Sequence, residues 1–233
     1  MILPVTLYAI PVPLGGAAAD ALPSSALKIV RGIDDFVVEN AKSARAFLKD
    51  AGRNPREIRI HQLQPGDDPR ALLEPLRQGR PLGLLSEAGC PAIADPGASL
   101  VEAAHGEGFR VVPLIGPSSI TLALMASGLE GQRFAFCGYL PREQELRNKK
   151  IRELENRSCR ERETELFIET PYRSDALLAS LIATCQARTR LCVAADLTLA
   201  TEFVSTKTVA QWRRAGTAVG RRPAVFLLLA QAR

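Results

Sequence analysis

The chain has 233 residues, of which 46% are hydrophobic and 24% are charged, and its 30 Lys and Arg against 25 Asp and Glu give a formal charge of +5. This composition is typical of a globular protein and excludes a disordered or collagen-like chain. The longest uninterrupted apolar run, Ala224–Ala230, is far shorter than the roughly 20 residues of a membrane-spanning helix, so we expect no membrane segment.

Five cysteines are scattered along the chain without a CxxC spacing, and there are only two histidines. The odd, dispersed set of cysteines argues against a disulfide framework and against a structural zinc site. No Lys or Arg precedes Lys28, and Pro4, Pro11 and Pro13 interrupt the apolar N-terminus, so no secretion signal is expected. These observations predict a cytoplasmic protein with reduced thiols and no metal.

Short apolar strands alternate with helices in the first half of the chain. The predicted strands cover residues 8–11, 36–38, 58–63, 82–86 and 110–115. The predicted helices cover residues 26–33, 41–50 and 69–79, and a fourth runs from Pro96 towards Gly108, with Asp68 and Asp95 as N-caps of the last two. Because a parallel crossover needs about a dozen residues, this alternation predicts a parallel sheet covered by helices on both faces.

The pattern restarts after a helix that opens at Ser118. Further strands are predicted at residues 134–137, 165–169, 191–195, 203–205 and 224–230, and helices at 143–155 and 174–185. Two of these strands have no helix between them, which indicates a mixed sheet. We therefore expect an α/β protein of two αβα domains. Residues 1–116 form the first domain around a mostly parallel sheet, and residues 117–233 form the second around a mixed sheet.

The positive charge is concentrated in the second half. Residues 116–233 carry a net charge of +6 and residues 1–115 a net charge of −1, and the segment from Lys207 to Arg233 holds six basic residues and no acid. Such a surface favours a phosphate-rich partner such as RNA. The alternative is that these residues only keep the protein soluble.

No GxGxxG follows a strand, and no GxxxxGK[ST] occurs, so the common nucleotide-binding loops are absent from the sequence. Three loops rich in Pro, Gly and small residues follow predicted strands, at residues 11–16, 86–97 and 115–119. Open α/β sheets bind ligands at the carboxyl ends of their strands, so the three loops together form a candidate site. Each loop alone could also be ordinary turn and cap chemistry.

The segments TLYAIPVPLGG, LLSEAGCPAIADPG, VVPLIGPSS, FAFCGYLP and FIETPYRS, in this order, resemble the successive motifs of the tetrapyrrole (corrin/porphyrin) methylase superfamily. Within it they are most similar to the family of ribosomal RNA small-subunit methyltransferase I, which methylates a ribose 2′-hydroxyl. The resemblance extends from Leu7 to about Leu229.

This resemblance implies a methyltransferase that uses S-adenosylmethionine as its cofactor and forms a homodimer. It assigns three groups of cofactor contacts: one near the methyl group and along the cofactor, one at its methionine end, and one at adenine and ribose. The first group is Pro13, Leu14, Gly15, Ser86, Ala88, Gly89, Cys90 and Ile93, the second is Ser118 and Ser119, and the third is Thr170, Leu197, Thr198 and Pro223.

A ribose hydroxyl must lose a proton when it is methylated, which requires a base or a cation that stabilises the developing oxyanion. The candidates near the loops are Glu39, Lys42, Glu87, Asp95, Glu169 and Arg173. We favour Glu39, with Lys42, because they occupy the position of the family's EDTR cluster. The alternative is that Glu39 caps the helix that follows it.

The chain departs from the family on the substrate side. The EDTR position reads ENAK at Glu39–Lys42, and the R-E-x-T-K segment reads ADLTL at Ala195–Leu199, without either cation. Two alternatives therefore stay open: methylation of a small molecule such as a tetrapyrrole, and a catalytically degenerate protein that only binds the cofactor. His61 either faces the site or is structural, and Trp212 either stacks on a base or buries a helix face.

Overall fold

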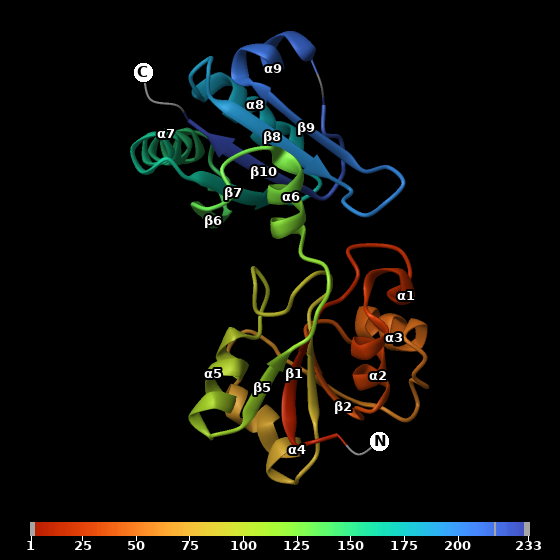
Figure 1. Cartoon of the computed structure of the whole chain (residues 1–233). Coiled ribbons are helices and arrows are strands. Elements are labelled where there is room, and N and C mark those ends of the chain that lie inside the picture. Colours follow the sequence, from red (N-terminus) through yellow and green to blue (C-terminus); the bar gives the residue numbers. More distant parts are fainter. Residues whose placement is uncertain (1–2, 217, 231–233) are drawn as a thin grey trace. The chain divides into compact units, whose positions relative to one another are not determined.

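The computed structural model describes residues 3–216 and 218–230, and the chain divides into two compact units, unit 1 (Met1–Ser118) and unit 2 (Ser119–Arg233). Each unit is built around its own five-stranded sheet (Figure 1). None of the described helices is both long enough and apolar enough to cross a bilayer.

The sheet of unit 1 is entirely parallel, with the strand order β3-β2-β4-β1-β5. Its strands are β1 (Thr6–Ile10), β2 (Asp35–Val38), β3 (Arg59–Gln62), β4 (Leu82–Leu85) and β5 (Arg110–Pro113). Its helices are α1 (Ala18–Ala21), α2 (Ser24–Arg31), α3 (Ala41–Asp50), the 3₁₀ helix η1 (Pro69–Leu73), α4 (Glu74–Arg77) and α5 (Ala98–Gly106).

Alternate side chains of the central strands enter two separate cores, one on each face of this sheet. Tyr8 and Ile10 pack with residues of α1, α2 and α3, whereas Leu7 packs with residues of η1, α4 and α5. The two helix groups accordingly lie on opposite sides of the strands (Figure 1). The prediction of a parallel sheet covered on both faces is confirmed.

The sheet of unit 2 is mixed, as predicted, with the order β6-β7-β10-β8-β9. Its strands are β6 (Phe134–Tyr139), β7 (Thr164–Glu169), β8 (Arg190–Ala195), β9 (Phe203–Thr208) and β10 (Ala224–Leu229), and its helices are α6 (Ser119–Ser127), α7 (Gln144–Glu161), α8 (Ser174–Thr184) and α9 (Val209–Ala215). The last strand, β10, runs antiparallel to both of its neighbours, β7 and β8. Residues of α7, α8 and α9 share one core with side chains of the sheet, including Phe167 stacked on Phe226 at 6.1 Å between ring centroids.

Three local predictions were wrong or incomplete. Asp68 does cap η1, but the single helix expected at residues 69–79 is divided into η1 and α4, because Pro75 has no N–H to continue the hydrogen-bond ladder. Asp95 does not cap α5, whose N-cap is Gly97, since the Asp95 side chain is hydrogen-bonded to Ser86 instead. Helices α1 and α9 were not predicted, although Thr208 and Gln211 form a capping box at the start of α9.

Candidate functional site

The loops that follow β1, β4 and β5 are joined to one another at the carboxyl edge of the unit 1 sheet. Val12 and Gly89 exchange two backbone hydrogen bonds of 2.8 Å each, which joins the first loop to the second. The Cys90 thiol donates to the carbonyl oxygen of Pro117 at 3.5 Å, which joins the second loop to the third. Three segments far apart in the sequence thus form one surface made largely of main chain.

Two glycines allow this close approach. Gly89 is buried and has a φ of +78°, a conformation that side chains of L-residues rarely adopt. At Gly116, a Cβ would lie 2.4 Å from Cβ of Pro11, so only glycine fits where the loops after β1 and β5 meet. The loop conformations are therefore fixed by the backbone and by small residues.

Around this surface lie the residues of unit 1 that were predicted to contact the cofactor. Pro13, Leu14 and Gly15 are half-buried in the loop after β1. The buried Ser86 hydroxyl lies 3.4 Å from the carbonyl oxygens of Ala88 and Gly89. The other predicted residues in these loops are Cys90, Ile93 and Ser118, of which Ile93 is 50% exposed. Ser119 is the first residue of α6 and belongs to unit 2.

Three carboxylates gather at the same edge. Burial raises the pKa of the Glu39 carboxyl above its usual range, and repulsion from the nearby Asp95 and Glu87 raises it further. The pKa of Asp95 is also raised, chiefly by burial. Ser43 donates to Glu87 at 3.4 Å. A carboxyl group with a raised pKa is a stronger proton acceptor once it is ionised.

The alternative role for Glu39, as a helix cap, is wrong. The N-cap of α3 is Asn40, whose side-chain oxygen accepts from the backbone N–H of Lys42 at 2.9 Å. This hydrogen bond uses only the main chain of Lys42, and its side chain is exposed. Glu39 and Lys42 therefore both keep side chains that are available to a ligand at this edge.

The predicted residues of unit 2 lie together at one end of its sheet. Because β10 is antiparallel to β7 and β8, its first residue, Ala224, pairs with Glu169 at the end of β7 and with Ala195 at the end of β8. Thr170, Leu197, Thr198 and Pro223 are next to these paired residues in the chain. Asp196 N–H donates to the Pro223 carbonyl at 3.2 Å and so joins two of these segments.

Several other candidates are already engaged. Arg173 forms a salt bridge with Glu169 at 2.6 Å, so neither is a free cation or base. His61 contacts Asp35 through Nε2 at 3.2 Å, which supports its structural reading. Trp212 is 1% exposed and donates from Nε1 to the Leu191 carbonyl, so it buries a helix face and cannot stack on a base. The described residues contain no group of three or more His, Cys, Asp or Glu that could hold a metal ion.

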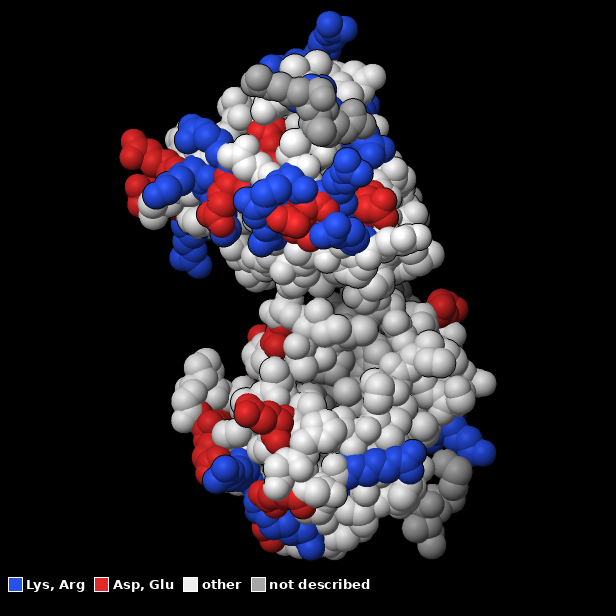
Figure 2. Space-filling view, turned by 60° about the vertical axis from the view of Figure 1, so that its left-hand side comes forward, with Lys and Arg blue, Asp and Glu red and all other residues white. Residues whose placement is uncertain are grey.

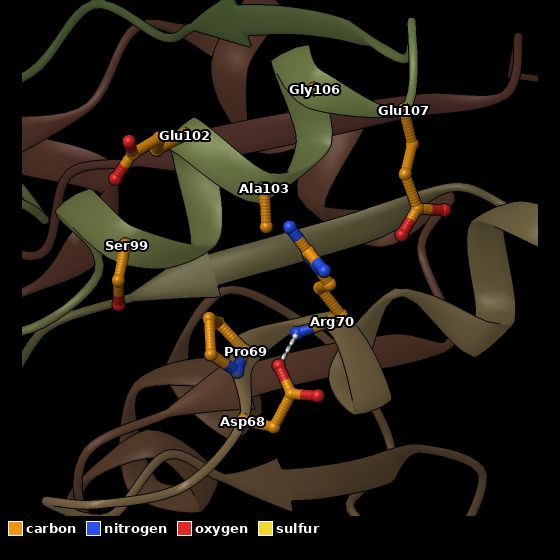
Figure 3. Close-up of a pocket in the computed structure, with 8 residues that line it drawn as sticks. All are labelled: Asp68, Pro69, Arg70, Ser99, Glu102, Ala103, Gly106 and Glu107. Atoms are coloured by element: carbon orange, nitrogen blue, oxygen red, sulfur yellow. Dashed lines mark hydrogen bonds between the residues drawn. The ribbon is translucent and has the colours of Figure 1, made fainter.

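A cavity of about 610 Å³ lies elsewhere on unit 1, between η1 and α5 (Figure 3). It is lined by Asp68, Pro69, Arg70, Ser99, Glu102, Ala103, Gly106 and Glu107, none of which was predicted to bind the cofactor. Of its carboxylates, Glu107 is paired with Arg77 at 2.6 Å. This cavity is distinct from the edge where the three loops meet.

Sequence reasoning missed two features of the site. Val12 was not singled out, because its part in joining the loops is made by backbone groups that carry no sequence signal. Tyr172 is 81% exposed and lies 5.6 Å below the Arg221 guanidinium, a pairing that connects residues 49 positions apart. The quoted segment FIETPYRS and the basic C-terminal segment each contained one partner, but nothing in the sequence linked them.

The sequence matches one protein family and several relatives that share one name. Residues 6–212 match the family of Tetrapyrrole (Corrin/Porphyrin) Methylases. The chain is 31% identical over 198 residues to the ribosomal RNA small subunit methyltransferase I of Escherichia coli O157:H7, covering 85% of this chain and 67% of the relative. It is 30% identical to the protein of that name from Pasteurella multocida, covering 89% of this chain and 72% of the relative.

Solved structures share the fold. The chain superimposes on diphthine synthase with a TM-score of 0.67 and 18% identity, covering 97% of this chain and 90% of that one. It superimposes on the methyltransferase CobJ with a TM-score of 0.64 and 17% identity, covering 97% and 94% of the two chains. At these identities the likeness concerns the fold alone.

Proposed function

This chain belongs to the tetrapyrrole (corrin/porphyrin) methylase family and is an S-adenosylmethionine-dependent methyltransferase, and from this premise we propose that it methylates a ribose 2′-hydroxyl of ribosomal RNA. The observation that carries the proposal is its similarity, at about 30% identity over most of the chain, to proteins named ribosomal RNA small subunit methyltransferase I.

The loops of unit 1 fit the cofactor. We expect backbone groups and small side chains to make most of the contacts with the adenosyl and methionine parts of the cofactor. The edge around Val12 and Gly89 consists largely of such groups. Ile93 offers an exposed apolar side chain, and the carboxylates Glu39, Glu87 and Asp95 give the edge a negative potential that suits a sulfonium.

We propose specific contacts on this basis. Unit 1 supplies contacts near the methyl group and along the cofactor from Pro13, Leu14, Gly15, Ser86, Ala88, Gly89, Cys90 and Ile93. Ser118 and Ser119 bind the methionine end, and the unit 2 residues Thr170, Leu197, Thr198 and Pro223 bind the adenosine part. Burial raises the pKa of the Cys90 thiol, so this residue contributes a small neutral contact rather than a nucleophile.

When bound, the cofactor supplies an electrophilic methyl group. The chain's own residues have two tasks: to hold the acceptor hydroxyl in line, and to remove its proton. Glu39 takes the proton, because its side chain is accessible at the edge and its pKa is raised by partial desolvation from the surrounding protein and by its acidic neighbours Asp95 and Glu87. The Lys42 ammonium stabilises the negative charge that develops on the ribose oxygen.

A homodimer that works in the cytoplasm completes the proposal. Unit 2 carries exposed apolar side chains on its edge strand β6, where Phe134 is 45% and Tyr139 is 56% exposed, and Met125 of α6 is 80% exposed. A second copy of the chain would cover such side chains from water. All five cysteines are free thiols, as expected for a reducing compartment.

The test is a transfer assay with methyl-labelled cofactor. Its substrates are small ribosomal subunits and small-molecule extracts from a strain that lacks this gene, compared with the same preparations from the wild type. We expect label in the ribosomal RNA of the deletion strain, none in wild-type RNA, and loss of transfer in Glu39→Gln. The matched control is Glu145→Gln, an exposed acid on α7. Label in the small-molecule extract instead would favour a tetrapyrrole-type acceptor, and cofactor binding without transfer to either would favour the degenerate, non-catalytic protein.

A further inference from the structure

Some of the described Lys and Arg side chains of unit 2 form ion pairs with acidic side chains, and others do not. On α7 they alternate with acids and form ion pairs, including Lys150 with Glu153 at 2.7 Å and Arg160 with Glu161 at 2.7 Å. Figure 2, which brings the α7 side of unit 2 forward, shows Lys and Arg interspersed with Asp and Glu on this face. Several of the α7 cations are therefore already neutralised by neighbouring acids.

Arg221 and Arg222, in the loop before β10, have aromatic rather than acidic neighbours. The Arg221 guanidinium lies 5.6 Å from the centre of the Tyr172 ring, and that of Arg222 lies 5.3 Å from the centre of Phe203. Over residues 3–216 and 218–230 the structure gives neither arginine an ion pair. Tyr172 is 81% exposed and Arg221 is exposed as well. We call these four residues the arginine–aromatic surface.

The loop that presents this surface is held in place by the start of α8. The Asp175 carboxylate accepts backbone hydrogen bonds from Val219 at 2.7 Å and Gly220 at 3.0 Å. The Ser174 hydroxyl donates to the Arg222 carbonyl at 3.3 Å. These contacts fix the backbone of the loop that carries the two arginines, and Arg222 itself donates from Nε to the Val219 carbonyl oxygen at 2.5 Å. Two acids near the start of α8 already have partners, since Asp175 accepts from the loop backbone and Glu169 is paired with Arg173.

An exposed aromatic ring backed by an unpaired guanidinium matches the chemistry of a single-stranded nucleic acid. Bases stack on aromatic faces and on guanidinium planes, and the free N–H groups of arginine bind phosphate oxygens in pairs. We propose that the arginine–aromatic surface binds unpaired nucleotides of the acceptor RNA, with a base stacked against Tyr172 and Arg221 and a phosphate bound by the guanidinium groups. This inference rests on the proposed function and identifies where the acceptor strand is held.

The experiment measures binding of a fluorescent single-stranded oligoribonucleotide to the full chain at several salt concentrations. We expect Tyr172→Ala to weaken binding on the order of tenfold and Tyr172→Phe to retain it, since stacking needs the ring and not the hydroxyl. Arg221→Ala should lower the slope of log Kd against log salt by about 0.7, the value for one phosphate contact on a single strand. The matched control is Arg152→Ala, an exposed arginine of α7 that should bind as the wild type does.

Asp175→Ala separates this surface from a general effect of charge. Removing an acid would strengthen RNA binding if only net charge mattered, whereas release of the loop that holds Arg221 should weaken it. Thermal unfolding of each variant checks that unit 2 stays folded, and Tyr172→Phe gives a readout that does not depend on a folding change.

Three results would overturn the inference. If the wild type binds RNA and both Tyr172→Ala and Arg221→Ala bind it equally well, the surface is wrong while the proposed function stands. If Tyr172→Ala weakens cofactor binding instead of RNA binding, the surface belongs to the cofactor contacts. If the wild type neither binds RNA nor methylates it, the proposed function fails and the surface has no RNA to hold.

Discussion

Val12 and Gly89 form a two-way backbone bridge, in which each N–H donates to the other residue's carbonyl at 2.8 Å. The bridge joins the loops after β1 and β4, which follow neighbouring strands of the parallel sheet. Its geometry depends on main-chain groups, so the side chain at position 12 can vary, but the conformation at position 89 cannot. A φ of +78° makes Gly89 the position of this bridge that is most sensitive to substitution.

We expect Gly89→Arg to lose cofactor binding at least tenfold while the fold survives. The matched control is Gly79→Arg, because Gly79 has almost the same φ, +77°, and open space around it. Both variants should lose about 1–2 kcal/mol of unfolding free energy from the left-handed backbone. Calorimetric titration with the cofactor distinguishes them, and unchanged affinity in Gly89→Arg would remove this residue from the site.

The pH dependence of methyl transfer should report the carboxylates around Glu39. Transfer is expected to rise with pH as Glu39 ionises, because only the carboxylate form accepts a proton. Since Asp95 raises the pKa of Glu39, Asp95→Asn should shift this acid limb to lower pH. Glu102→Gln, an exposed acid of α5, is the control and should leave the limb in place. An acid limb that does not move in Asp95→Asn would exclude Glu39 as the base.

Asp35 predicts an acid-sensitive contribution to stability. Burial alone would raise its pKa, but hydrogen bonds from Arg59, Arg80 and His61 outweigh burial and hold the pKa well below the usual value of 3.8. A lowered folded-state pKa stabilises the protein above the unfolded value, and this stability is lost as pH falls below about 3.8. We expect Asp35→Asn to lower the unfolding free energy by about 2–3 kcal/mol at pH 7 and by only somewhat less at about pH 3, because the folded-state carboxyl is still ionised there and its stabilisation disappears only as pH falls through the lowered folded-state pKa.

The control for Asp35 is its neighbour Asp34, which is 56% exposed and forms a salt bridge with Arg53. Urea titrations measure the unfolding free energy of both variants, and Asp34→Asn should lower it by no more than about 1 kcal/mol. Cofactor affinity should be unchanged in both variants, because the first residue of β2 lies at the opposite edge of the sheet from the three loops. Equal losses from both variants would contradict this interpretation.

The single tryptophan offers a test without mutation. Trp212 is 1% exposed and its indole N–H donates to the Leu191 carbonyl at 2.8 Å, so acrylamide should quench its fluorescence weakly. Because Trp212 cannot reach a base, adding RNA should leave both the quenching and the emission maximum unchanged. Strong quenching in the free protein would place Trp212 outside the core of unit 2.

The alternation of strands and helices was sufficient to predict the parallel sheet of unit 1. Two successive strands without a helix between them were sufficient to predict the mixed sheet of unit 2. The errors occur where one residue could take either of two local roles that look alike in the sequence. Asp95 has the sequence context of a helix cap, but it bonds to Ser86, and Gly97 takes the cap position with a φ of +126°. Pro75 was read as part of one helix because a proline in a first turn and a proline that divides a helix look alike in sequence.

The loops of the candidate site could be picked out from the sequence, because they have distinctive small residues at fixed places in the alternation of strands and helices. What the sequence could not supply was pairing between distant residues. The bridge between Val12 and Gly89 and the stack of Arg221 on Tyr172 both depend on how strands are ordered in a sheet. The same reason explains Glu169 and Arg173, which looked like free catalytic candidates and are bonded to each other.

The antiparallel placement of β10 has an evolutionary consequence. β10 begins beside the last residues of β7 and β8. The connection at residues 218–223 therefore leads to the ends of two other strands but is part of no strand itself. Insertions or substitutions in this connection can change which molecules the unit recognises while the buried strands keep their lengths and partners. We therefore expect homologues with different acceptors to diverge most in this short connection.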